Sequence, residues 1–259
     1  MQDRQLNRRQ YFRELADTSG HYFIPYINRF IHVDASLHIL EIGCGDGGNL
    51  LPFARIGCKV TGCDMAECRV SDARRFFDEE CAIGTFIASD VFKLKDLEGR
   101  FDLIICHDVI EHIPDKAEFM RKCVTLLRPG GSLFMSFPAW QMPFGGHQQI
   151  CHSRLVSHLP WIHLLPASLY AWALRKAGEN EGCVRELLDI KATRCPIELF
   201  EKSVPQDFQI VDRTPWLINP HYRVKFGLTP IRLWTPLGKI PYLRNFLTTS
   251  AFYFLKMKD

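Results

Sequence analysis

Short apolar runs separated by amphipathic, helix-compatible segments fill the first half of the chain. The apolar runs lie near residues 39–42, 59–64, 85–88, 101–107 and 132–137. Runs that are apolar throughout are typical of strands buried on both faces of a parallel sheet. The segments between them, such as 71–80 and 119–127, are polar on one side and fit surface helices. Four βα repeats followed by a fifth strand predict an α/β protein with a doubly wound sheet.

Glycine and carboxylate residues stand at the ends of the first three predicted strands. The first strand runs into the glycine turn 43–48, the second ends at Asp64, and the third is followed by Asp90. In open α/β sheets, ligands bind at the carboxyl ends of the strands. A glycine turn lets the backbone lie against a ligand, and the next helix directs free N–H groups toward it. The turn alone leaves two cofactors open, because Gly43-x-Gly45-x-x-Gly48 with an acid about 20 residues later also fits a nicotinamide dinucleotide site.

Glu41 distinguishes between these cofactors. A carboxylate two positions before the glycine turn suits a ligand that carries positive charge, whereas a dinucleotide site usually has an apolar residue there. Glu41, Gly43, Gly45 and Gly47 resemble motif I, E-x-G-x-G-x-G, of the class I S-adenosylmethionine (SAM) methyltransferases. Residues 101–115, FDLIICHDVIEHIPD, resemble the fourth-strand motif of the type 11, or ubiquinone-biosynthesis-type, methyltransferases. LLRPGG at 126–131 resembles their LxPGG element, and the whole resemblance covers residues 35–138.

The resemblance implies a Rossmann-like α/β fold with a doubly wound, mostly parallel seven-stranded sheet. It also implies SAM as cofactor and S-adenosylhomocysteine (SAH) as product. Glu41 and the glycine turn would lie beside the methionine portion of SAM, Asp64 on the ribose and Asp90 at the adenine amino group. A cap of the following helix is the alternative role for Asp90. The cofactor-binding residues implied in this way are Glu41, Gly43, Cys44, Gly45, Gly47, Asp64, Met65, Asp90, Val91, Cys106 and His107.

Residues 1–34 are expected to form a helical lid, and residues 35–138 the SAM-binding core. Apolar residues between 6 and 15 recur at helical spacing, and Thr18-Ser19-Gly20 predicts a break before a second helix. In the resembled family such helices close over the cofactor, so Tyr22 and Tyr26 are candidates for the lid. Packing in the core explains either tyrosine equally well.

Residues 139–206 are expected to form a helical substrate cap. Within it, residues 155–174 contain no Asp, Glu, Lys or Arg and are long enough to span a bilayer. Pro160, Pro166 and the polar residues around them argue against one continuous membrane helix. We therefore expect short helices that wall an apolar substrate pocket.

Residues 207–259 are expected to supply the last two strands, at 207–213 and 248–258, with an insertion at about 219–246. Aromatic, proline and basic residues alternate in this insertion. From residue 219 onward the chain has seven Lys and Arg against one acid, Asp259. This part therefore carries a charge of +6, and the rest of the chain carries −3. A solvated basic face and contact with an anionic membrane surface both fit the pattern.

The composition is that of one globular domain, 1–259, with 47% apolar and 24% charged residues. The net charge of +3 is too small to indicate a nucleic-acid partner. The ten cysteines include no CxxC pair, and Cys44, Cys63 and Cys106 lie in or beside predicted strands, so we expect reduced thiols. The first residues contain no apolar leader. Together these features favour the cytoplasm, with peripheral membrane contact as a second option.

Methyl transfer to a hydroxyl group requires a base as well as an aligned donor. The candidate bases are His107, Asp108, Glu111 and His112 after the fourth strand, and His147 and His152 after the fifth. His147 is the first candidate, because its loop would lie over the methyl group, and His107 is the second. His147, Cys151 and His152 have metal-like spacing. No fourth ligand stands nearby and the resembled family needs no metal, so no metal site is expected.

The predicted function is transfer of a methyl group from SAM to a small-molecule or lipid-linked acceptor, on a hydroxyl oxygen. A sugar or glycan precursor is an alternative acceptor. A SAM-binding protein without catalysis and a nicotinamide-dependent oxidoreductase are the alternatives from other classes. The acceptor, the base and the oligomeric state do not follow from the sequence.

Overall fold

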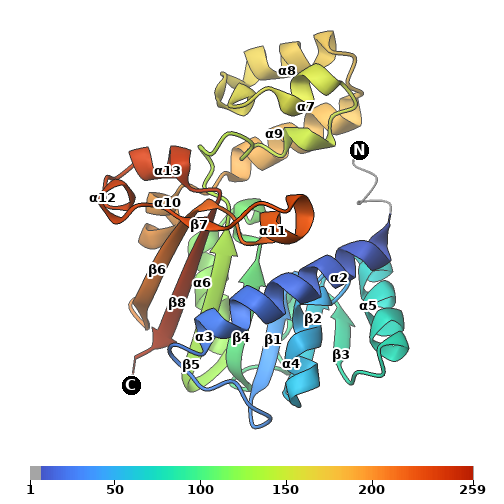
Figure 1. Ribbon diagram of the computed structural model, residues 1–259, viewed down its shortest axis with the longest axis vertical. Coiled ribbons are helices and arrows are strands. Elements are labelled where there is room, and N and C mark those ends of the chain that lie inside the picture. The colour runs from blue at the N-terminus through green and yellow to red at the C-terminus, as the bar shows by residue number, and fades with distance from the viewer. Residues whose placement is uncertain (1–6, 259) are drawn as a thin grey trace.

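The computed structural model describes residues 7–258, and these fold around one mixed sheet with helices on both faces (Figure 1). The sheet has eight strands in the order β3-β2-β1-β4-β5-β8-β6-β7. This order confirms the predicted α/β class and the doubly wound arrangement. The expected lid residues 1–6 and the C-terminal Asp259 lie outside the described residues.

The parallel half of the sheet consists of the five strands expected from the apolar runs. They are β1 (His38–Ile42), β2 (Lys59–Asp64), β3 (Thr85–Ala88), β4 (Phe101–His107) and β5 (Leu127–Phe137). β1 pairs with β2 and β4, β2 with β3, and β4 with β5. The crossover helices are α4 (Leu51–Ile56), α5 (Glu67–Glu79) and α6 (Lys116–Leu126). Every residue of β4 is buried, as a strand covered on both faces requires.

The Pro129-Gly130-Gly131 turn lies inside β5 instead of before it. Phe101 of β4 pairs with Leu127, but the next pair joins Leu103 to Ser132. The pairing therefore skips the turn, which forms a bulge near the start of the strand.

Three antiparallel strands extend the sheet beyond β5. They are β8 (Ser250–Met257), β6 (Phe208–Ile218) and β7 (Ile231–Arg232). The expected number of seven strands is wrong by one, because β7 forms inside the insertion and pairs with Trp216 and Ile218 of β6. β6 also continues past residue 213, since its second half pairs with β8 and β7.

The N-terminal segment crosses one face of the sheet as one helical run (Figure 1). α2 (Arg8–Thr18), the π-helical turn η1 (Ser19–Phe23) and α3 (Ile24–Ile27) follow one another directly. The expected break at 18–20 is therefore wrong. The π turn lets the Ser19 hydroxyl donate to the Asn49 carbonyl at 2.7 Å without ending the helix. Tyr26 is 5% exposed and donates to Asp212, so it packs in the core.

Two apolar clusters fill the two faces of the sheet. Alternate residues of β4 belong to different clusters, with Ile104 in one and Leu103 and Ile105 in the other. The first cluster includes Phe119 of α6, and the second includes Phe12 of α2. Because both faces are covered, ligand-type residues are left for the ends of the strands.

The cap residues 139–206 are largely helical, as predicted. They contain α7 (Arg154–His158), η6 (Ile162–Leu164), α8 (Ala167–Lys176), α9 (Glu181–Thr193) and α10 (Ile197–Ser203). α7, α8 and α9 stand together at the top of Figure 1 and share a separate apolar cluster. The uncharged stretch 155–174 is divided among α7, η6 and α8. Among residues 7–258, no helix is long and apolar enough to cross a bilayer.

The insertion 219–246 contains α11 (His221–Phe226), β7, α12 (Thr235–Gly238) and most of α13 (Leu243–Leu247). α11 packs against α2 of the lid. Their contact includes a hydrogen bond between Thr18 Oγ1 and His221 Nδ1 at 2.9 Å. The insertion and the lid therefore meet over the same edge of the sheet.

Candidate functional site

Gly45 is the point of the glycine turn that faces open space. A Cβ on Gly45 would meet no atom within 4 Å, and the φ of this residue is +50°. A Cβ on Gly48 would lie 2.4 Å from the Phe12 carbonyl oxygen of α2. The two glycines therefore serve different neighbours. Gly48 admits the N-terminal helix, and Gly45 leaves the space that a ligand requires.

Glu41, in β1, is a buried carboxylate that is only half satisfied. Asn49 Nδ2 donates to its Oε1 at 2.7 Å, whereas Oε2 has no hydrogen-bond partner among the described residues. The pKa of Glu41 is raised to about 8, chiefly by burial. The Asn49 hydrogen bond opposes this rise, and the nearby Asp64 charge adds to it. An unpartnered buried polar atom costs about 1–3 kcal/mol. The arrangement fits a cationic ligand group, such as the amino group of SAM.

Asp64 and Asp90 occupy the ends of β2 and β3. Asp64 accepts the N–H groups of Gly45 and Ala66, both at 2.9 Å, so it ties β2 to the glycine turn. Each of its oxygens keeps a second lone pair that ribose hydroxyls could use. Asp90 Oδ1 accepts the Phe92 N–H at 3.1 Å, which caps the short helix η3 (Val91–Lys93). The capping alternative for Asp90 is thus confirmed, and its adenine contact stays a prediction.

The other expected cofactor residues differ in how they are placed. Met65 is 78% exposed and Val91 is 6% exposed. Cys44 and Cys106 are buried, and burial raises the pKa of both thiols. Cys106 packs within an apolar cluster, so only its main chain can face a cofactor. The predicted cofactor contact of Cys106 is therefore limited to its main-chain atoms.

Asp46 is a residue of the glycine turn that sequence reasoning missed. Its buried side chain forms ion pairs with Arg8 of α2 and with Arg69 of α5, the latter at 3.6 Å. Burial raises the pKa of Asp46, and the two guanidinium groups oppose that shift. The pairs draw the N-terminal helix over the turn. In the sequence, the acid inside the glycine turn and the arginines of the first helix are the signal that could have predicted this contact.

Four polar residues gather where β4 and β5 end, namely Asp108, Glu111, His112 and His147. The rings of His112 and His147 meet edge to face with their centroids 5.1 Å apart. Glu111, His112 and His147 each offer one ligand-type atom within 4.8 Å of the others. Both oxygens of Glu111 are buried without a hydrogen-bond partner among the described residues. The group can hold a polar acceptor or a divalent cation.

Burial keeps the imidazoles of this group neutral. The pKa of His147 is lowered to about 4, chiefly by burial. His112 contributes to this shift, and Asp108 opposes it. Burial also lowers the pKa of His112. Burial, reinforced by Asp108, raises the pKa of Glu111 well above its ordinary value. At neutral pH both imidazoles are therefore in the form that can accept a proton.

His107 is held between the lid and the sheet. Its Nδ1 lies 3.1 Å from Ser136 Oγ, and its Nε2 lies 3.5 Å from Asp108 Oδ2. The Phe23 ring packs edge-on against it with a centroid distance of 5.1 Å. These contacts suit a residue that positions Asp108 better than one that moves toward an acceptor.

His152 and Cys151 lie apart from His147. His152 Nδ1 is 3.4 Å from Glu179 Oε2, and Cys151 clusters with Glu179 and Cys183. The spacing that grouped His147, Cys151 and His152 is therefore misleading, because the chain divides them between two clusters.

Tyr11 of α2 and Tyr222 of α11 lie within electrostatic reach of Asp108, and sequence reasoning missed them. Burial is the main cause that raises the pKa of both phenols, and the Asp108 charge contributes to each rise. The resulting pKa of Tyr11 is about 12. The Tyr11 and His221 rings lie edge to face with centroids 6.4 Å apart. No local pattern connects residue 11 with residue 222, so only the packing of α11 on α2 reveals this wall of the site.

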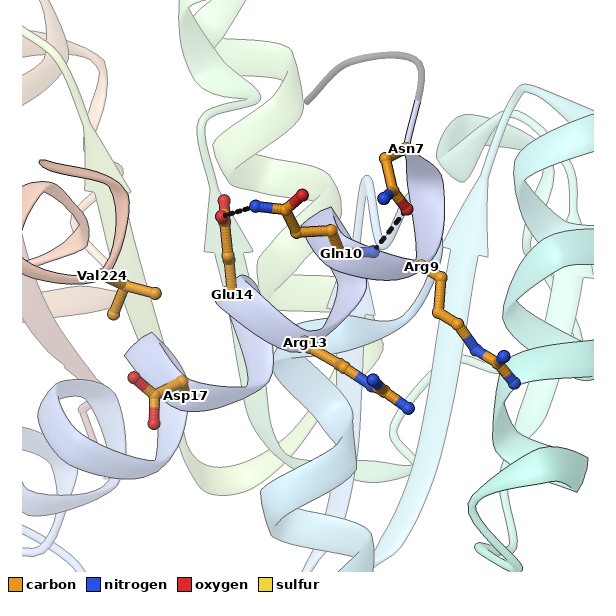
Figure 2. Close-up of a pocket in the computed structure, with 7 residues that line it drawn as sticks. All are labelled: Asn7, Arg9, Gln10, Arg13, Glu14, Asp17 and Val224. Atoms are coloured by element: carbon orange, nitrogen blue, oxygen red, sulfur yellow. Dashed lines mark hydrogen bonds between the residues drawn. The ribbon is translucent and has the colours of Figure 1, made fainter. Parts of the chain in front are cut away.

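A surface groove of about 440 Å³ lies along α2, away from the strand ends (Figure 2). Figure 2 shows that Gln10 donates to Glu14 and that Asn7 accepts from the Gln10 backbone. Several polar groups of the groove thus bind one another. Its lining residues are Asn7, Arg9, Gln10, Arg13, Glu14, Asp17 and Val224.

Residues 40–135 match the family model described as a methyltransferase domain. A ubiquinone biosynthesis O-methyltransferase of Coxiella burnetii is 33% identical over 113 residues, which cover 44% of this chain and 48% of that protein. One from Xanthomonas euvesicatoria is 35% identical over 156 residues, which cover 56% and 63%. The chain therefore spans about half the length of the curated relatives it matches.

Solved structures share the fold at low identity. A putative sarcosine dimethylglycine methyltransferase from Galdieria sulphuraria has a TM-score of 0.59 at 12% identity, covering 92% of this chain and 84% of that chain. The plantazolicin methyltransferase BpumL in complex with SAH has a TM-score of 0.54 at 12% identity, covering 99% and 87%. The [4+2]-cyclase SpnF has a TM-score of 0.55 at 14% identity, covering 91% and 79%. At these identities the likeness concerns the fold alone.

Proposed function

We propose that this chain transfers a methyl group from SAM to a hydroxyl oxygen of a small-molecule or lipid-linked acceptor. The match of residues 40–135 to a methyltransferase-domain model supports the reaction class. One observation carries the proposal, the row of ligand-type groups along one edge of the sheet. Glu41 and Asp64 lie at the ends of β1 and β2, and the group around His147 lies where β4 and β5 end. Because β4 is the neighbour of β1, the proposed donor and acceptor subsites would adjoin.

Methyl transfer from a sulfonium is an in-line displacement, so alignment of the two partners supplies much of the rate. When bound, SAM supplies the electrophilic methyl group. Glu41 would pair with its amino group, Asp64 with its ribose hydroxyls, and Asp90 with its adenine. The neutral imidazole of His147 would accept the proton of the acceptor hydroxyl, with His112 beside it.

The insertion 219–246 supports an acceptor presented at an anionic membrane surface. Phe226, Trp234 and Tyr242 are 54%, 69% and 68% exposed. Exposed aromatic and basic side chains on one segment suit the headgroup region of an anionic bilayer. The exposed basic residues of the segment are Arg223, Arg232 and Lys239, with Lys225 half-buried, whereas Arg244 is buried in ion pairs with Glu198 and Glu201. Tyr222 of the same segment lies within electrostatic reach of Asp108, so the insertion would connect that surface with the acceptor subsite.

Other acceptors and classes stay as alternatives. The hydroxyls of Tyr11 and Tyr222 beside Asp108 would also suit a sugar or glycan precursor. SAM binding without catalysis is the alternative from another class. The family match favours SAM over a nicotinamide cofactor.

The roles of the chain segments are part of the same proposal. Residues 1–34 would act as lid, 35–138 as SAM-binding core, 139–206 as substrate cap and 207–259 as the closing strands with their insertion. All ten cysteines are free thiols, which supports a reducing compartment such as the cytoplasm.

Isothermal titration with SAM, SAH and NAD tests the cofactor. We expect SAM and SAH to bind at one site and NAD not to bind, and binding of NAD alone would overturn the proposal. Incubation with labelled SAM and a metabolite extract then identifies the acceptor by mass spectrometry. A label on nitrogen or carbon would contradict the hydroxyl acceptor, and SAM binding without any labelled product would support the noncatalytic alternative.

Liposome cosedimentation tests the membrane surface. We expect binding to rise with the anionic lipid content and to fall when Arg223, Arg232 and Lys239 are changed to Gln. Lys93→Gln with Lys95→Gln, two exposed lysines outside the insertion, is the control. If the insertion variant binds like the wild type, the surface lies elsewhere or does not exist.

A further inference from the structure

We propose that Cys151, Glu179, Cys183 and His152 form a structural site for a thiophilic divalent cation, of which Zn²⁺ is the chemical fit, within the cap. This inference stands apart from the proposed function, since it uses none of the strand-end residues. One sulfur from each cysteine and one oxygen from Glu179 all lie within 4.8 Å of one another. All three residues are buried.

The spacing of the three ligand atoms approaches that of a zinc site. Zn–S bonds of about 2.3 Å place neighbouring ligand atoms about 3.8 Å apart. Small side-chain rotations therefore bring the three ligand atoms onto one cation. His152 Nδ1 lies 3.4 Å from Glu179 Oε2 but outside the group of three, so its exposed imidazole would have to turn toward the two sulfurs to become the fourth ligand. Thiolate, imidazole and carboxylate are the three ligand types that Zn²⁺ uses in proteins.

The remaining contacts of Glu179 orient its carboxylate as second-sphere contacts do in metal sites. Its oxygens accept the backbone N–H groups of His152 at 3.2 Å and Ser153 at 2.8 Å. Its one ion-pair partner among the described residues is the His152 imidazole. The carboxylate thus faces two thiols with no lysine or arginine beside it in that part of the chain. A divalent cation would offset two of the three negative charges that two thiolates and a carboxylate carry.

Tyr170 supplies an independent sign of a polar centre in the cap. Its side chain is 0% exposed, and its hydroxyl has no hydrogen-bond partner among the described residues. Burial raises the pKa of the Tyr170 phenol, and the Cys151 and Cys183 thiols, when ionised, contribute to the rise. A phenol O–H beside a metal-bound thiolate would have the acceptor that it otherwise lacks.

A simple disulfide between Cys151 and Cys183 explains less of the cluster. A disulfide would use both sulfurs but leave the buried Glu179 carboxylate beside an apolar bond. It would also give no role to His152. Binding of Zn²⁺ uses all four groups, and each thiol releases its proton to solvent when it becomes a ligand.

The site would fix the loop that carries His147. Cys151 follows directly on the short helix η5 (Gln148–Ile150), and His147 is its N-cap. Cys183 lies in the first turn of α9, whose other end receives a hydrogen bond from Lys116 Nζ to the Thr193 carbonyl. A cation at this point would therefore link the His147 loop to the helix that packs on the β4–α6 connection.

Cobalt substitution tests the site directly. The full chain, reduced and stripped of metal with EDTA, is titrated with Co²⁺ and followed by thiolate-to-cobalt charge-transfer absorption. We expect one equivalent to produce the band and Zn²⁺ to displace it, with one zinc per chain by elemental mass spectrometry. Cys151→Ser and Cys183→Ser should each lose the band, and His152→Ala should weaken Zn²⁺ binding tenfold or more.

Matched controls separate this site from other thiols and from the strand-end cluster. Cys68→Ser and Cys81→Ser alter exposed cysteines and should leave the band unchanged. His147→Ala should also leave it unchanged. Added Zn²⁺ should raise the melting temperature of the wild type but not of a folded Cys183→Ser variant.

The absence of a charge-transfer band in the reduced wild type would overturn the inference. A band that survives in both cysteine variants would overturn it as well. So would reduced protein that binds no metal but forms a Cys151–Cys183 disulfide, detected in its peptides after exposure to glutathione disulfide. The titration of SAM into the same protein is independent of these outcomes, so failure here leaves the proposed function intact.

Discussion

The edge of the sheet formed by the carboxyl ends of its strands and the cap above it hold their polar residues in different ways. At the edge, Glu41, Asp64 and His107 belong to the last residues of strands whose register is fixed by their neighbours. In the cap, Cys151 and Glu179 come from two connecting segments, and Cys183 comes from the start of a helix. The edge residues share the main core of the protein, whereas the cap has an apolar cluster of its own.

This difference predicts which variants change chemistry and which change structure. A side chain on a paired strand can be altered while the ladder keeps the backbone in place. A side chain that joins short helices contributes to the packing that positions them. Edge variants should therefore change binding at constant stability, and cap or lid variants should change stability first.

His147→Gln should give the largest effect. His147 bridges the two regions, because its loop leads into the cap while its ring meets His112 at the edge. Loss of the proton acceptor should lower kcat about 10²-fold or more. SAM affinity, measured by titration, should stay unchanged, with His158→Gln, an exposed histidine on α7, as control. A normal kcat would show that another residue accepts the proton.

Asp64→Ala should give the next largest effect. Loss of charge-assisted hydrogen bonds to the ribose should weaken SAM binding by about 1.5–3 kcal/mol, or roughly 10-fold to 150-fold. Isothermal titration measures the change, and Asp78→Ala on the exposed side of α5 is the matched control. Unchanged affinity in a folded Asp64→Ala variant would refute the ribose contact.

Glu41→Gln should remove a pH dependence of SAM binding. Since the pKa of Glu41 is raised to about 8, the carboxyl group is protonated at pH 6 and must lose its proton to pair with the amino group. Wild-type affinity should rise with pH up to about 8, by at most about tenfold per unit. The variant should lack this part of the slope when both are titrated from pH 6 to pH 8.

The same residue affects stability with the opposite sign. The folded pKa of about 8 exceeds the ordinary value of 4.5, so the stabilising contribution is full below pH 4.5. It is lost as the pH rises through 8. Urea unfolding at pH 5 and pH 8 should therefore show a larger loss for the unliganded wild type than for Glu41→Gln. Equal losses would mean that Glu41 is ionised in the free protein.

Thr18→Val should give the smallest effect, and one on stability. Thr18 is fully buried and shares a hydrogen bond with His221, which joins the lid to the insertion. Its loss should lower the free energy of unfolding by about 0.5–1.5 kcal/mol in urea denaturation. Thr125→Val, on an exposed position of α6, is the control. A large loss of SAM affinity without a loss of stability would place Thr18 in the binding site itself.

The sequence predicts the parallel half because its signals there are local. The continuous apolar run of β4 and the glycine turn after β1 each describe one element and its end. The expected cofactor residues of that half lie at those ends, so their convergence follows from the parallel order. β7 has no such signal, because two residues are too few to show an alternation of apolar and polar positions. It forms because β6 offers unpaired backbone groups to Ile231 and Arg232.

The acceptor side of the site could be predicted only in part. Residues 108–112 follow a strand directly, and their place was foreseen. The approach of His147 to His112, and its separation from His152, depend on how the loop after β5 turns. His147 adopts a φ of +56°, an uncommon value for a residue with a side chain, and no sequence pattern indicated it. The walls made by Tyr11 and Tyr222 depend on packing between opposite ends of the chain.

The two outer strands of the sheet have a consequence for solubility. β3 has four residues and β7 has two, and these short strands are the first and last in the strand order. Pro230 precedes β7 and offers no N–H group, and Arg232 places a charge on it. Brief, charged or proline-flanked edges present few unpaired groups to another chain. The long apolar strands are thereby kept in the interior of the sheet, where they cannot pair with a second molecule and start aggregation.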